Sequence, residues 1–289
     1  MPELPEVEVV KRSLEKKILN LIIKKVEIID GKLRYKINKE NTSKLIGKKI
    51  RKIKRKSKFL IFEIEKNLFM ITHLGMTGKF FFIDKMKKKY KTSFYYSLDK
   101  EKDQKHNRVI ISFKDKQKLI YNDVRKFGFI KFYNSIEFKS SQHFRSLGPE
   151  PLGKYWNKEY FKKYISGRDR SIKNILMDQK FVCGLGNIYV NEILFFSCIN
   201  PLRKVSSLKG IEIEKIVQNT KKILRNSIRL GGSSIKNFST DDGKKGVFQQ
   251  YFKVYGRKGE NCSNTDCNKQ ILRTTVANRS TFFCKRCQK

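Results

Sequence analysis

Four cysteines near the C-terminus have the spacing of a zinc site. They form the pattern C-x4-C-x16-C-x2-C and are Cys262, Cys267, Cys284 and Cys287. Two thiolate pairs separated by the length of a hairpin can surround one Zn²⁺ tetrahedrally, and four thiolates leave no open position for a catalytic water. We therefore predict one structural zinc ion. The alternative is that some of these cysteines are free and buried, although so short and polar a tail has little else to hold it together.

Arg279 lies between the two cysteine pairs, where two strands are expected. Residues 271–275 and 280–283 have the pattern of strands, and residues 276–279 join them. The arginine is therefore expected near the tip of a hairpin stiffened by the metal. A guanidinium held there is suited to a phosphate group because its planar fork can bind two oxygens at once.

The first residues, MPELPEVE, offer a nucleophile beside two carboxyl groups. Removal of Met1 would leave the secondary amine of Pro2 at the N-terminus, and a terminal amine with a pKa near 8 is partly unprotonated at neutral pH. Such an amine can attack a sugar carbon and form a Schiff base. Glu3 and Glu6 offer one carboxyl for general acid catalysis and a second that positions or balances it. The alternative is that this segment merely caps the following helix, where acidic residues are favourable.

The chain is strongly basic, with 66 Lys and Arg against 27 Asp and Glu and a formal net charge of +39 over 289 residues. A surface this positive attracts phosphate backbones, so nucleic acid is the favoured partner. The alternative is that an A/T-rich genome has raised the lysine content without selection for binding. No apolar run approaches the roughly 20 residues that span a bilayer, and the first residues lack the order of a signal peptide, so we expect a cytoplasmic protein.

The N-terminal half should supply a helix followed by a β-sandwich or barrel. Val7, Val10, Leu14 and Ile18 recur at helical spacing. Alternating or wholly apolar runs then predict strands over residues 24–29, 59–64, 68–71, 79–83, 109–113, 118–121 and 129–133. Short strands separated by turns are typical of antiparallel sandwiches and barrels. The lysine-rich segment 84–108 is expected to be a long, mobile loop.

The pattern becomes helical after residues 147–153, whose prolines and glycines indicate a linker between domains. Apolar residues at helical spacing predict helices over residues 172–179, 188–196 and 208–230. Gly231 and Gly232 should end the last of these helices.

Several motifs, in order along the chain, resemble those of the formamidopyrimidine-DNA glycosylases. Besides MPELPEVE and the four-cysteine tail, they are HLGMTG (73–78), DVRKFG (123–128), LGPEPL (147–152), IKNILMDQ (172–179), CGLGNIYVNE (183–192), VYGRKGE (254–260) and RSTFFCKRCQK (279–289). Each motif is short, but the ordered set covers nearly the whole chain and is very specific.

The resemblance implies an α+β protein of several domains that acts as a monomer on double-stranded DNA. The expected domains are an N-terminal antiparallel β-sandwich with its leading helix (2–134), a linker (135–152), a helical helix-two-turns-helix domain with a lesion-covering loop (153–250) and a zinc-finger β-hairpin (251–289). DNA containing oxidised bases would bind in the cleft between sandwich and helical domain. The implied activity is that of a bifunctional DNA glycosylase and AP lyase of the bacterial nucleoid. It would excise 8-oxoguanine and formamidopyrimidines through a Pro2 Schiff base and cleave the strand by β,δ-elimination, with no small-molecule cofactor.

The resemblance also assigns roles to individual residues. Pro2 would be the nucleophile, and Glu3 the acid or base that assists release of the base. Lys58 would match a lysine used in catalysis and phosphate binding, and Arg279 an arginine linked to phosphate binding and the second elimination. Further DNA-contacting positions would be His73, His106, Arg125 and Asn187. The lesion would be met by Glu6, Ser233, Ile235, Lys236, Asn237 and Phe238.

The residue types suit these roles, although each also has a plainer interpretation. An extruded base leaves a gap in the stack, which Met76, Arg125 and Phe127 are suited to fill. Without the resemblance, Met76 and Phe127 would be interpreted as core residues. Asn187 precedes a helix, where it either attracts phosphate or merely caps that helix. Nothing in the run RKSKFL separates Lys58 from the neighbouring solvated lysines.

Two features depart from the family. The first cysteine pair encloses four residues instead of the usual two, which lengthens one zinc knuckle. The segment 84–108 is also longer than expected, so the placement of His106 depends on aligning KHNRV across an insertion.

Rival functions remain open at this point. An endonuclease VIII-type enzyme would excise oxidised pyrimidines, but Leu4, where that branch is expected to have glycine, and the pair Arg125 and Phe127 favour the purine-directed branch. A DNA-binding protein without catalysis would have no use for Pro2 and Lys58. A zinc-ribbon RNA-binding factor would explain the charge and the cysteines but not the N-terminal motif.

Overall fold

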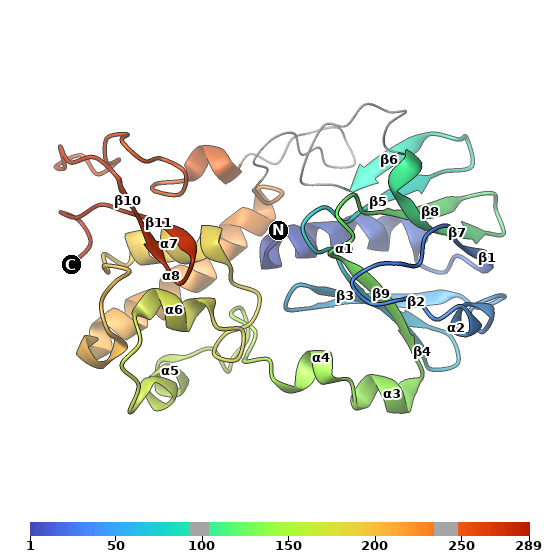
Figure 1. The fold of residues 1–289 in the computed structure, drawn as a ribbon, viewed down its shortest axis with the longest axis horizontal. Helices are drawn as coiled ribbons and strands as arrows, with labels where there is room; N and C mark the ends of the chain where they lie inside the picture. Colours follow the sequence, from blue (N-terminus) through green and yellow to red (C-terminus); the bar gives the residue numbers. More distant parts are fainter. Residues whose placement is uncertain (93–103, 234–247) are drawn as a thin grey trace. The chain divides into compact units, whose positions relative to one another are not determined.

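The computed structural model describes residues 1–92, 104–233 and 248–289, which form two compact units (Figure 1). The first unit contains Met1–Gln142 and the described part of Leu230–Gln249. The second contains His143–Arg229 and Gln250–Lys289. The described residues 230–233 and 248–249 thus group with the N-terminal unit, whereas the sequence assigned them to the helical domain. The expected domain boundaries stay a prediction.

Helix α1 (Leu4–Ile18) opens the first unit and confirms the predicted helix. Its apolar residues recur every three or four positions, and the side chains of Val7, Val10, Leu14 and Ile18 are all buried. The opposite face carries charges that pair along the helix, among them Lys11 with Glu15 at 2.8 Å. This one-sided pattern presses α1 onto the core of the unit.

Two antiparallel sheets form the body of the first unit, which confirms the predicted sandwich. The five-stranded sheet has the order β1-β7-β8-β5-β6 and the four-stranded sheet the order β2-β3-β4-β9. The strands are β1 (Ile23–Ile28), β2 (Ile50–Lys56), β3 (Phe59–Ile64), β4 (Leu68–His73), β5 (Lys79–Ile83), β6 (Lys89–Thr92), β7 (Asn107–Phe113), β8 (Lys118–Asn122) and β9 (Phe129–Tyr133). The core lies between the sheets, where the ring of Phe62 on β3 lies 6.0 Å from that of Phe80 on β5.

The sequence missed two of these strands. Only Ile50 and Ile53 of β2 are buried, because the strand lies at a sheet edge and its other residues are cationic. The segment 84–108, expected to be a loop, contains the edge strand β6 and a 3-10 turn, η1 (Gln104–His106). Tyr90 of β6 is covered by the Lys17 ammonium at 3.7 Å from its ring centroid, a contact that no local pattern announces. Residues 93–103 of the segment lie outside the description.

The expected linker 135–152 is partly helical. It contains α3 (Ser135–Lys139) and α4 (Gln142–Arg145). The Asn134 side chain accepts from the N–H groups of Ile136 and Glu137, both at 2.9 Å, and the Glu137 carboxylate accepts from the Asn134 N–H at 2.8 Å. This reciprocal capping starts α3 without an apolar periodicity.

The second unit is mainly helical and ends in a hairpin (Figure 1). Its helices are α5 (Lys158–Ile165), α6 (Ile172–Met177), α7 (Asn187–Phe196) and α8 (Gly210–Arg229), and the hairpin strands are β10 (Leu272–Val276) and β11 (Arg279–Phe283). Short turns complete the description: α2 (Glu40–Ser43), η2 (Val205–Ser207) and η3 (Phe248–Tyr251). Within the described residues, none of the helices combines the length and apolar character of a membrane span.

One helix end differs from expectation and another agrees with it. Helix α6 stops at Met177, and the Gln179 side chain accepts from the Gly184 N–H and donates to the Leu185 carbonyl, both at 2.8 Å, instead of continuing the helix. Helix α8 ends at Arg229 and is followed, as expected, by Gly231 and Gly232, which adopt φ values of 80° and 83°.

Candidate functional site

The N-terminal carboxyl groups are buried in the first turn of α1. Glu3 and Glu6 are 4% and 1% exposed, and Pro2 is also buried. The Glu6 carboxylate accepts three hydrogen bonds, each 2.9 Å long: one from the Glu3 N–H and two from the N–H and hydroxyl of Ser233. These bonds satisfy a buried charge and tie the segment after α8 to the start of the chain.

The terminal amine lies among charged groups of the first unit. Burial lowers the pKa of the Met1 amine below its usual 8.0, the carboxylates of Glu3 and Glu6 oppose that shift, and the cations Lys58 and Arg125 reinforce it. The amine is therefore more often unprotonated than a solvated one at the same pH. The predicted nucleophile, acids and lysine accordingly share one environment.

Lys58 differs from the neighbouring lysines in its burial, a difference that the sequence pattern did not indicate. Lys58 is only 6% exposed, whereas Lys54 and Lys56 lie on the exposed side of β2. The tight turn between β2 and β3 makes the difference, because Ser57 there takes a positive φ of 54° and is itself buried.

Asp123 joins the loops that carry the motifs HLGMTG and DVRKFG. Its buried carboxylate accepts from the Thr77 hydroxyl and from the Gly128 N–H at 2.8 Å, while the Thr77 hydroxyl also accepts from the Arg125 N–H at 2.9 Å. The loops touch at Gly75, where a Cβ atom would lie 2.4 Å from the Gly128 nitrogen. Sequence reasoning missed this role of Asp123, although an acidic residue inside a matched motif was the available signal.

The two joined loops present Met76, Arg125 and Phe127 to solvent. Met76 is 38% and Phe127 48% exposed, so the alternative interpretation of both as core residues is wrong. The Arg125 guanidinium lies 4.6 Å from the centroid of the Phe127 ring. Three adaptable or planar side chains thus project from one rigid pair of loops, and their proposed role in filling a base stack stays a prediction.

His73 and His106 flank the same loops. The Nδ1 atom of His73 accepts from the Gly75 N–H at 3.0 Å, so the proton of the neutral ring lies on Nε2, and the ring stacks on Phe129 at 5.8 Å. The His106 carbonyl accepts from the Asp123 N–H at 3.1 Å. The structure thus places both histidines beside the two joined loops, and their contact with DNA stays a prediction.

Of the predicted lesion-contacting residues, Glu6 and Ser233 are joined as described above. The other members of that set, Ile235, Lys236, Asn237 and Phe238, lie outside the described residues.

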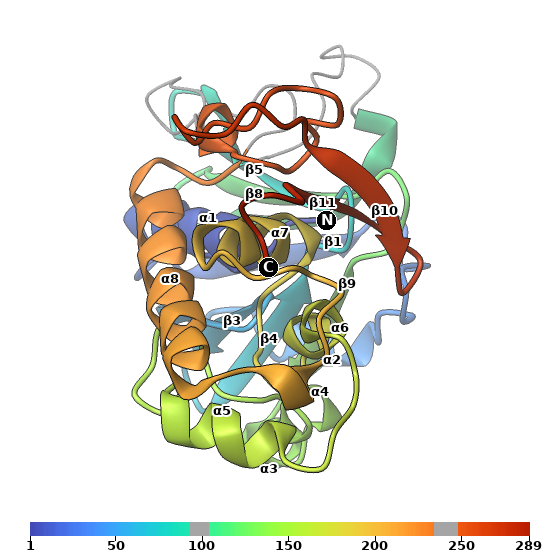
Figure 2. The ribbon, with the colours of Figure 1, turned by 90° about the vertical axis from the view of Figure 1, so that its left-hand side faces the viewer.

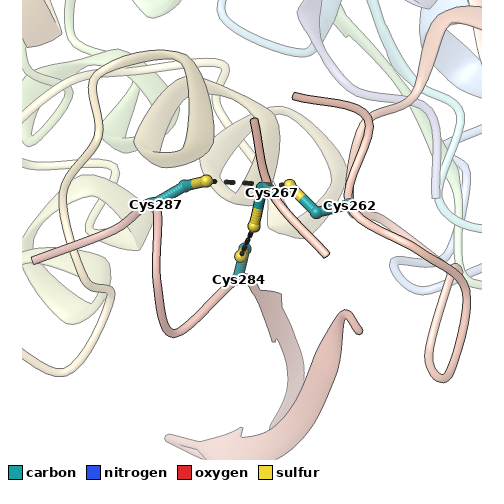
Figure 3. A group of neighbouring side chains, drawn as sticks. All are labelled: Cys262, Cys267, Cys284 and Cys287. Atoms are coloured by element: carbon teal, nitrogen blue, oxygen red, sulfur yellow. Dashed lines mark hydrogen bonds between the residues drawn. The ribbon is translucent and has the colours of Figure 1, made fainter. Parts of the chain in front are cut away.

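The four tail cysteines gather at one point in the second unit (Figure 3). Their sulfurs all lie within 4.8 Å of one another, with 3.8 Å between Cys262 and Cys287 and 3.6 Å between Cys267 and Cys284. A Zn–S bond of about 2.3 Å gives a tetrahedron with edges of about 3.8 Å, so the set fits one such ion. The Lys269 N–H lowers the pKa of the Cys267 thiol to about 7, whereas burial raises the pKa of the Cys262 and Cys287 thiols. The longer first knuckle therefore does not prevent the sulfurs from meeting.

The hairpin beyond this cluster places Arg279 at its tip. Ala277 and Asn278 have φ values of 49° and 56°, the left-handed conformation of a two-residue turn, and Val276 pairs with Arg279 directly across it. Arg279 is exposed. The predicted hairpin and its exposed arginine are therefore present.

Helices α6 and α7 hold the hairpin through strand β11. The buried Lys173 ammonium donates to the Ser280 carbonyl at 3.1 Å and to the Thr281 hydroxyl at 2.6 Å, and Asn187 donates to the same carbonyl at 2.9 Å. Burial, with a smaller contribution from Arg279, lowers the pKa of Lys173 to about 8. The N-cap of α7 is Gly186, so the interpretation of Asn187 as an ordinary N-cap is wrong.

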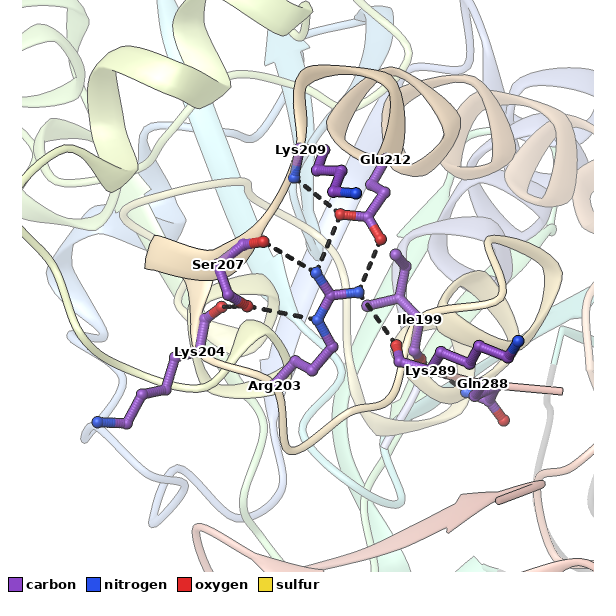
Figure 4. A network of polar contacts seen from close by, with 8 residues as sticks. All are labelled: Ile199, Arg203, Lys204, Ser207, Lys209, Glu212, Gln288 and Lys289. Carbon is purple, nitrogen blue, oxygen red and sulfur yellow. Dashed lines mark hydrogen bonds and ion pairs between the residues drawn. The ribbon is translucent and has the colours of Figure 1, made fainter. Parts of the chain in front are cut away.

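The last residues bind back to the loop between α7 and α8 (Figure 4). Gln288 donates to the Ile199 carbonyl at 2.9 Å, and Arg203 donates to the Lys289 carbonyl at 3.1 Å. The Arg203 guanidinium also holds both carboxylate oxygens of Glu212, at 2.7 and 3.0 Å. The cysteine-rich tail is thereby fastened to the helices at its far end.

Glu192 of α7 anchors the segment VYGRKGE. Its carboxylate is 1% exposed and accepts from the N–H groups of Lys253, Val254 and Tyr255 at 2.8, 3.0 and 2.8 Å. Burial raises the pKa of Glu192, and the three backbone donors oppose that shift. Sequence reasoning did not identify this residue, because its partners lie about 60 positions further along the chain.

Two family models and many relatives match the chain. The formamidopyrimidine-DNA glycosylase N-terminal domain matches residues 1–130, and the formamidopyrimidine-DNA glycosylase H2TH domain matches residues 147–239. Formamidopyrimidine-DNA glycosylases of Rickettsia canadensis and Rickettsia felis are each 38% identical, in alignments that cover 100% of this chain and 99% and 98% of theirs.

Solved structures agree with this result. A mutant of the Lactococcus lactis enzyme in complex with Fapy-dG containing DNA is 34% identical, with a TM-score of 0.85 and coverage of 100% of both chains. The complex of the Lactococcus lactis enzyme with DNA containing an abasic site is 33% identical, with a TM-score of 0.84 and coverage of 99% of both chains. These similarities extend over the sandwich, the helices and the hairpin alike, and the chain belongs to the formamidopyrimidine-DNA glycosylase family.

Proposed function

We propose that this DNA glycosylase excises 8-oxoguanine and formamidopyrimidines from double-stranded DNA and then cleaves the strand as an AP lyase. The observation that carries the proposal is the start of the chain, where Pro2, Glu3 and Glu6 are buried and where Glu3, Glu6, Lys58 and Arg125 are the charged neighbours of the terminal amine. The similarity to an enzyme bound to Fapy-dG containing DNA supports the lesion class, and Leu4 with the exposed pair of Arg125 and Phe127 supports the purine-directed branch.

In the proposed reaction, removal of Met1 frees the nitrogen of Pro2, which attacks C1′ of the damaged nucleotide. A C–N bond forms while the base leaves with the electron pair of the glycosidic bond and takes up a proton, a step that Glu3 assists. The nitrogen loses its proton, and the sugar opens as O4′ takes up a proton, which leaves an iminium ion between Pro2 and C1′. The iminium ion acidifies the sugar, so loss of a C2′ proton expels the 3′ phosphate and a second elimination expels the 5′ phosphate. Water then hydrolyses the iminium ion and frees Pro2.

The surroundings of the N-terminus favour the unprotonated amine, which is the form that can act as the nucleophile. Burial lowers the pKa of the Met1 amine, and the nitrogen of Pro2, which belongs to a buried residue, would be disfavoured as a cation for the same reason. Lys58, itself buried, adds a positive charge that favours the neutral form of the amine and that could bind the phosphate of the attacked nucleotide.

The remaining assignments concern how DNA is held. His73, Lys58, Asn187 and Arg279 would contact phosphates, and His106 and Arg125 would be further DNA contacts. Arg125 would also hydrogen-bond the base left without a partner. Met76 and Phe127, exposed beside it, would fill the gap in the stack. One structural zinc ion bound by the four cysteines would hold the hairpin that carries Arg279. We expect a monomer that associates with the nucleoid through this affinity for DNA.

Borohydride trapping tests the proposal. The purified protein is incubated with a duplex containing 8-oxoguanine opposite cytosine in the presence of borohydride, which reduces the imine to a stable covalent bond. We expect a trapped complex that is absent for Pro2→Gly, which replaces the secondary ring amine by a primary amine, and present for the matched change Pro5→Ala, which alters a buried proline of the same turn but leaves the secondary amine of Pro2.

Three results would contradict the proposal. Binding without trapping indicates a DNA-binding protein without catalysis, and trapping only on oxidised pyrimidines indicates the endonuclease VIII-type specificity. Mass spectrometry that finds Met1 still attached in fully active protein would rule out Pro2 as the nucleophile.

A further inference from the structure

Helix α8 carries a row of exposed cations along one side. Lys215, Lys222 and Arg229 follow one another at intervals of seven residues, about two helical turns, and Arg225 lies beside them. All four are exposed, and we call them the α8 stripe. The buried residues of the helix, such as Ile216, lie on the opposite side, so the stripe faces away from the core of the unit.

The charges of the α8 stripe are not neutralised within the described chain. After Glu214 the helix contains no further carboxylate, and no described acidic side chain forms an ion pair with a member of the stripe. The other long helix, α1, is different, since its Lys11 and Arg12 pair with Glu15 and Glu8 at 2.8 and 3.1 Å. A high lysine content alone would therefore not predict this surface.

Repulsion between the like charges of the α8 stripe lowers the stability of helix α8. Lys222 and Arg225 are three residues apart and Arg225 and Arg229 four, spacings at which like charges on a helix repel one another. A polyanion laid along the stripe would remove this repulsion. The row is about 21 Å long, which corresponds to about six base pairs of duplex DNA.

The α8 stripe is separate from the DNA-contacting positions proposed above for the second unit. Helix α7, which carries Asn187, packs on the buried side of α8 and holds the hairpin on its own far side (Figure 2). A helix is about 10–12 Å thick with its side chains. A phosphate bound by Asn187 therefore cannot also reach the exposed side of α8.

We propose that the α8 stripe binds the phosphate backbone of a second DNA segment, so that one molecule can bridge two duplexes. Charge complementarity with a regular row of phosphates selects this partner. An anionic membrane is the other polyanionic surface, but a helix adsorbs to a membrane through its apolar face, and that face of α8 is buried in the core. The proposal does not depend on the chemistry of Pro2.

A two-duplex capture experiment tests it with the full-length protein. One duplex containing a tetrahydrofuran abasic analogue is fixed to beads, the protein is bound and washed, and a labelled undamaged duplex is added at several salt concentrations. The test variant replaces the whole stripe with glutamine (Lys215→Gln, Lys222→Gln, Arg225→Gln, Arg229→Gln). The matched control removes four exposed lysines of the first unit that have no described ion pair (Lys24→Gln, Lys66→Gln, Lys114→Gln, Lys118→Gln).

Four phosphate contacts predict that the affinity for the labelled duplex falls about 100-fold between about 50 and 200 mM salt. In the stripe variant, the affinity for the labelled duplex should be at least about tenfold lower, and most of its salt dependence should be gone. The control variant should bind the labelled duplex with the affinity and salt dependence of the unmodified protein. Protein retained on the beads reports the first DNA site independently, so failure of that site is distinguishable from failure of the stripe.

The proposal would be overturned if the stripe variant captured the labelled duplex as well as the unmodified protein does, or if the control variant lost as much capture as the stripe variant. It would also be overturned if the unmodified protein bound anionic vesicles and the stripe variant lost that binding while it still captured the labelled duplex. Circular dichroism checks the fold of the variant, whose helix should be at least as stable because like charges have been removed. If it nevertheless unfolds, the double change Lys222→Gln with Arg225→Gln must lower the salt dependence by about half.

Discussion

The buried Glu6 carboxylate offers a quantitative test of the first unit. In Glu6→Gln, the amide oxygen can replace only one carboxylate oxygen, and the amide NH2 must then face a donor, either the Glu3 N–H or the N–H and hydroxyl of Ser233. Loss of a charge-assisted bond that leaves a buried donor unsatisfied costs about 1–3 kcal/mol. Glu6→Ala leaves all three donors without the carboxylate and should cost more, about 2–6 kcal/mol if the two backbone groups stay dry.

Urea titration combined with hydrogen exchange measures these costs. The matched control is Glu15→Gln, which removes a partly exposed partner of Lys11 on the same helix and should change the free energy of unfolding by less than about 0.5 kcal/mol. The Ser233 amide should lose protection in Glu6→Gln. The chain has one tryptophan, Trp156, buried in the second unit, so its fluorescence reports that unit separately. A Glu6→Gln protein as stable as Glu15→Gln, with Ser233 still protected, would refute the reasoning.

Three further predictions follow from the other contacts. Asp123→Asn removes an acceptor that joins two loops and should increase exchange of the Gly128 amide and weaken lesion-DNA binding by about tenfold in a fluorescence titration, whereas unchanged exchange would contradict the coupling. Removal of metal by a chelator should abolish DNA binding while the strands of the sandwich keep their exchange protection, and zinc should restore it; binding that survives demetallation would exclude a structural ion. Because the folded chain holds Lys173 at a pKa of about 8, below its ordinary 10.5, the unfolded chain binds more protons between these values, so the contribution of Lys173 to stability should rise with pH above about 8. Urea titrations of Lys173→Met should lack that rise, and an identical pH profile would show that the ammonium is not buried in solution.

The difference between Lys58 and its neighbours illustrates what local patterns cannot report. The three lysines 54, 56 and 58 have the same chemistry and lie within five positions. Only the turn at Ser57 and the packing around it remove one of them from water. Burial is a property of the whole fold, because the atoms that exclude water come from distant parts of the chain.

The amino-acid sequence by itself determined α1, most strands of the sandwich, helices α7 and α8 and the cysteine set. Each of these depends on a short period or spacing that the chain carries locally: apolar residues every three or four positions, alternation in strands, and paired thiolates. The ordered motifs also sufficed to indicate the family. These patterns can be recognised in the sequence without knowledge of any contact between distant residues.

The tertiary structure alone decided which polar groups act together. Glu6 meets Ser233 across 227 positions, Thr77 meets Asp123 across 46, and Lys173 meets Thr281 across 108. The edge strands β2 and β6 likewise form because a neighbouring strand supplies their hydrogen bonds, not because their own residues are apolar. Contacts between residues so far apart leave no periodic pattern in the sequence, because the two partners meet only when the chain between them has folded into a closed loop.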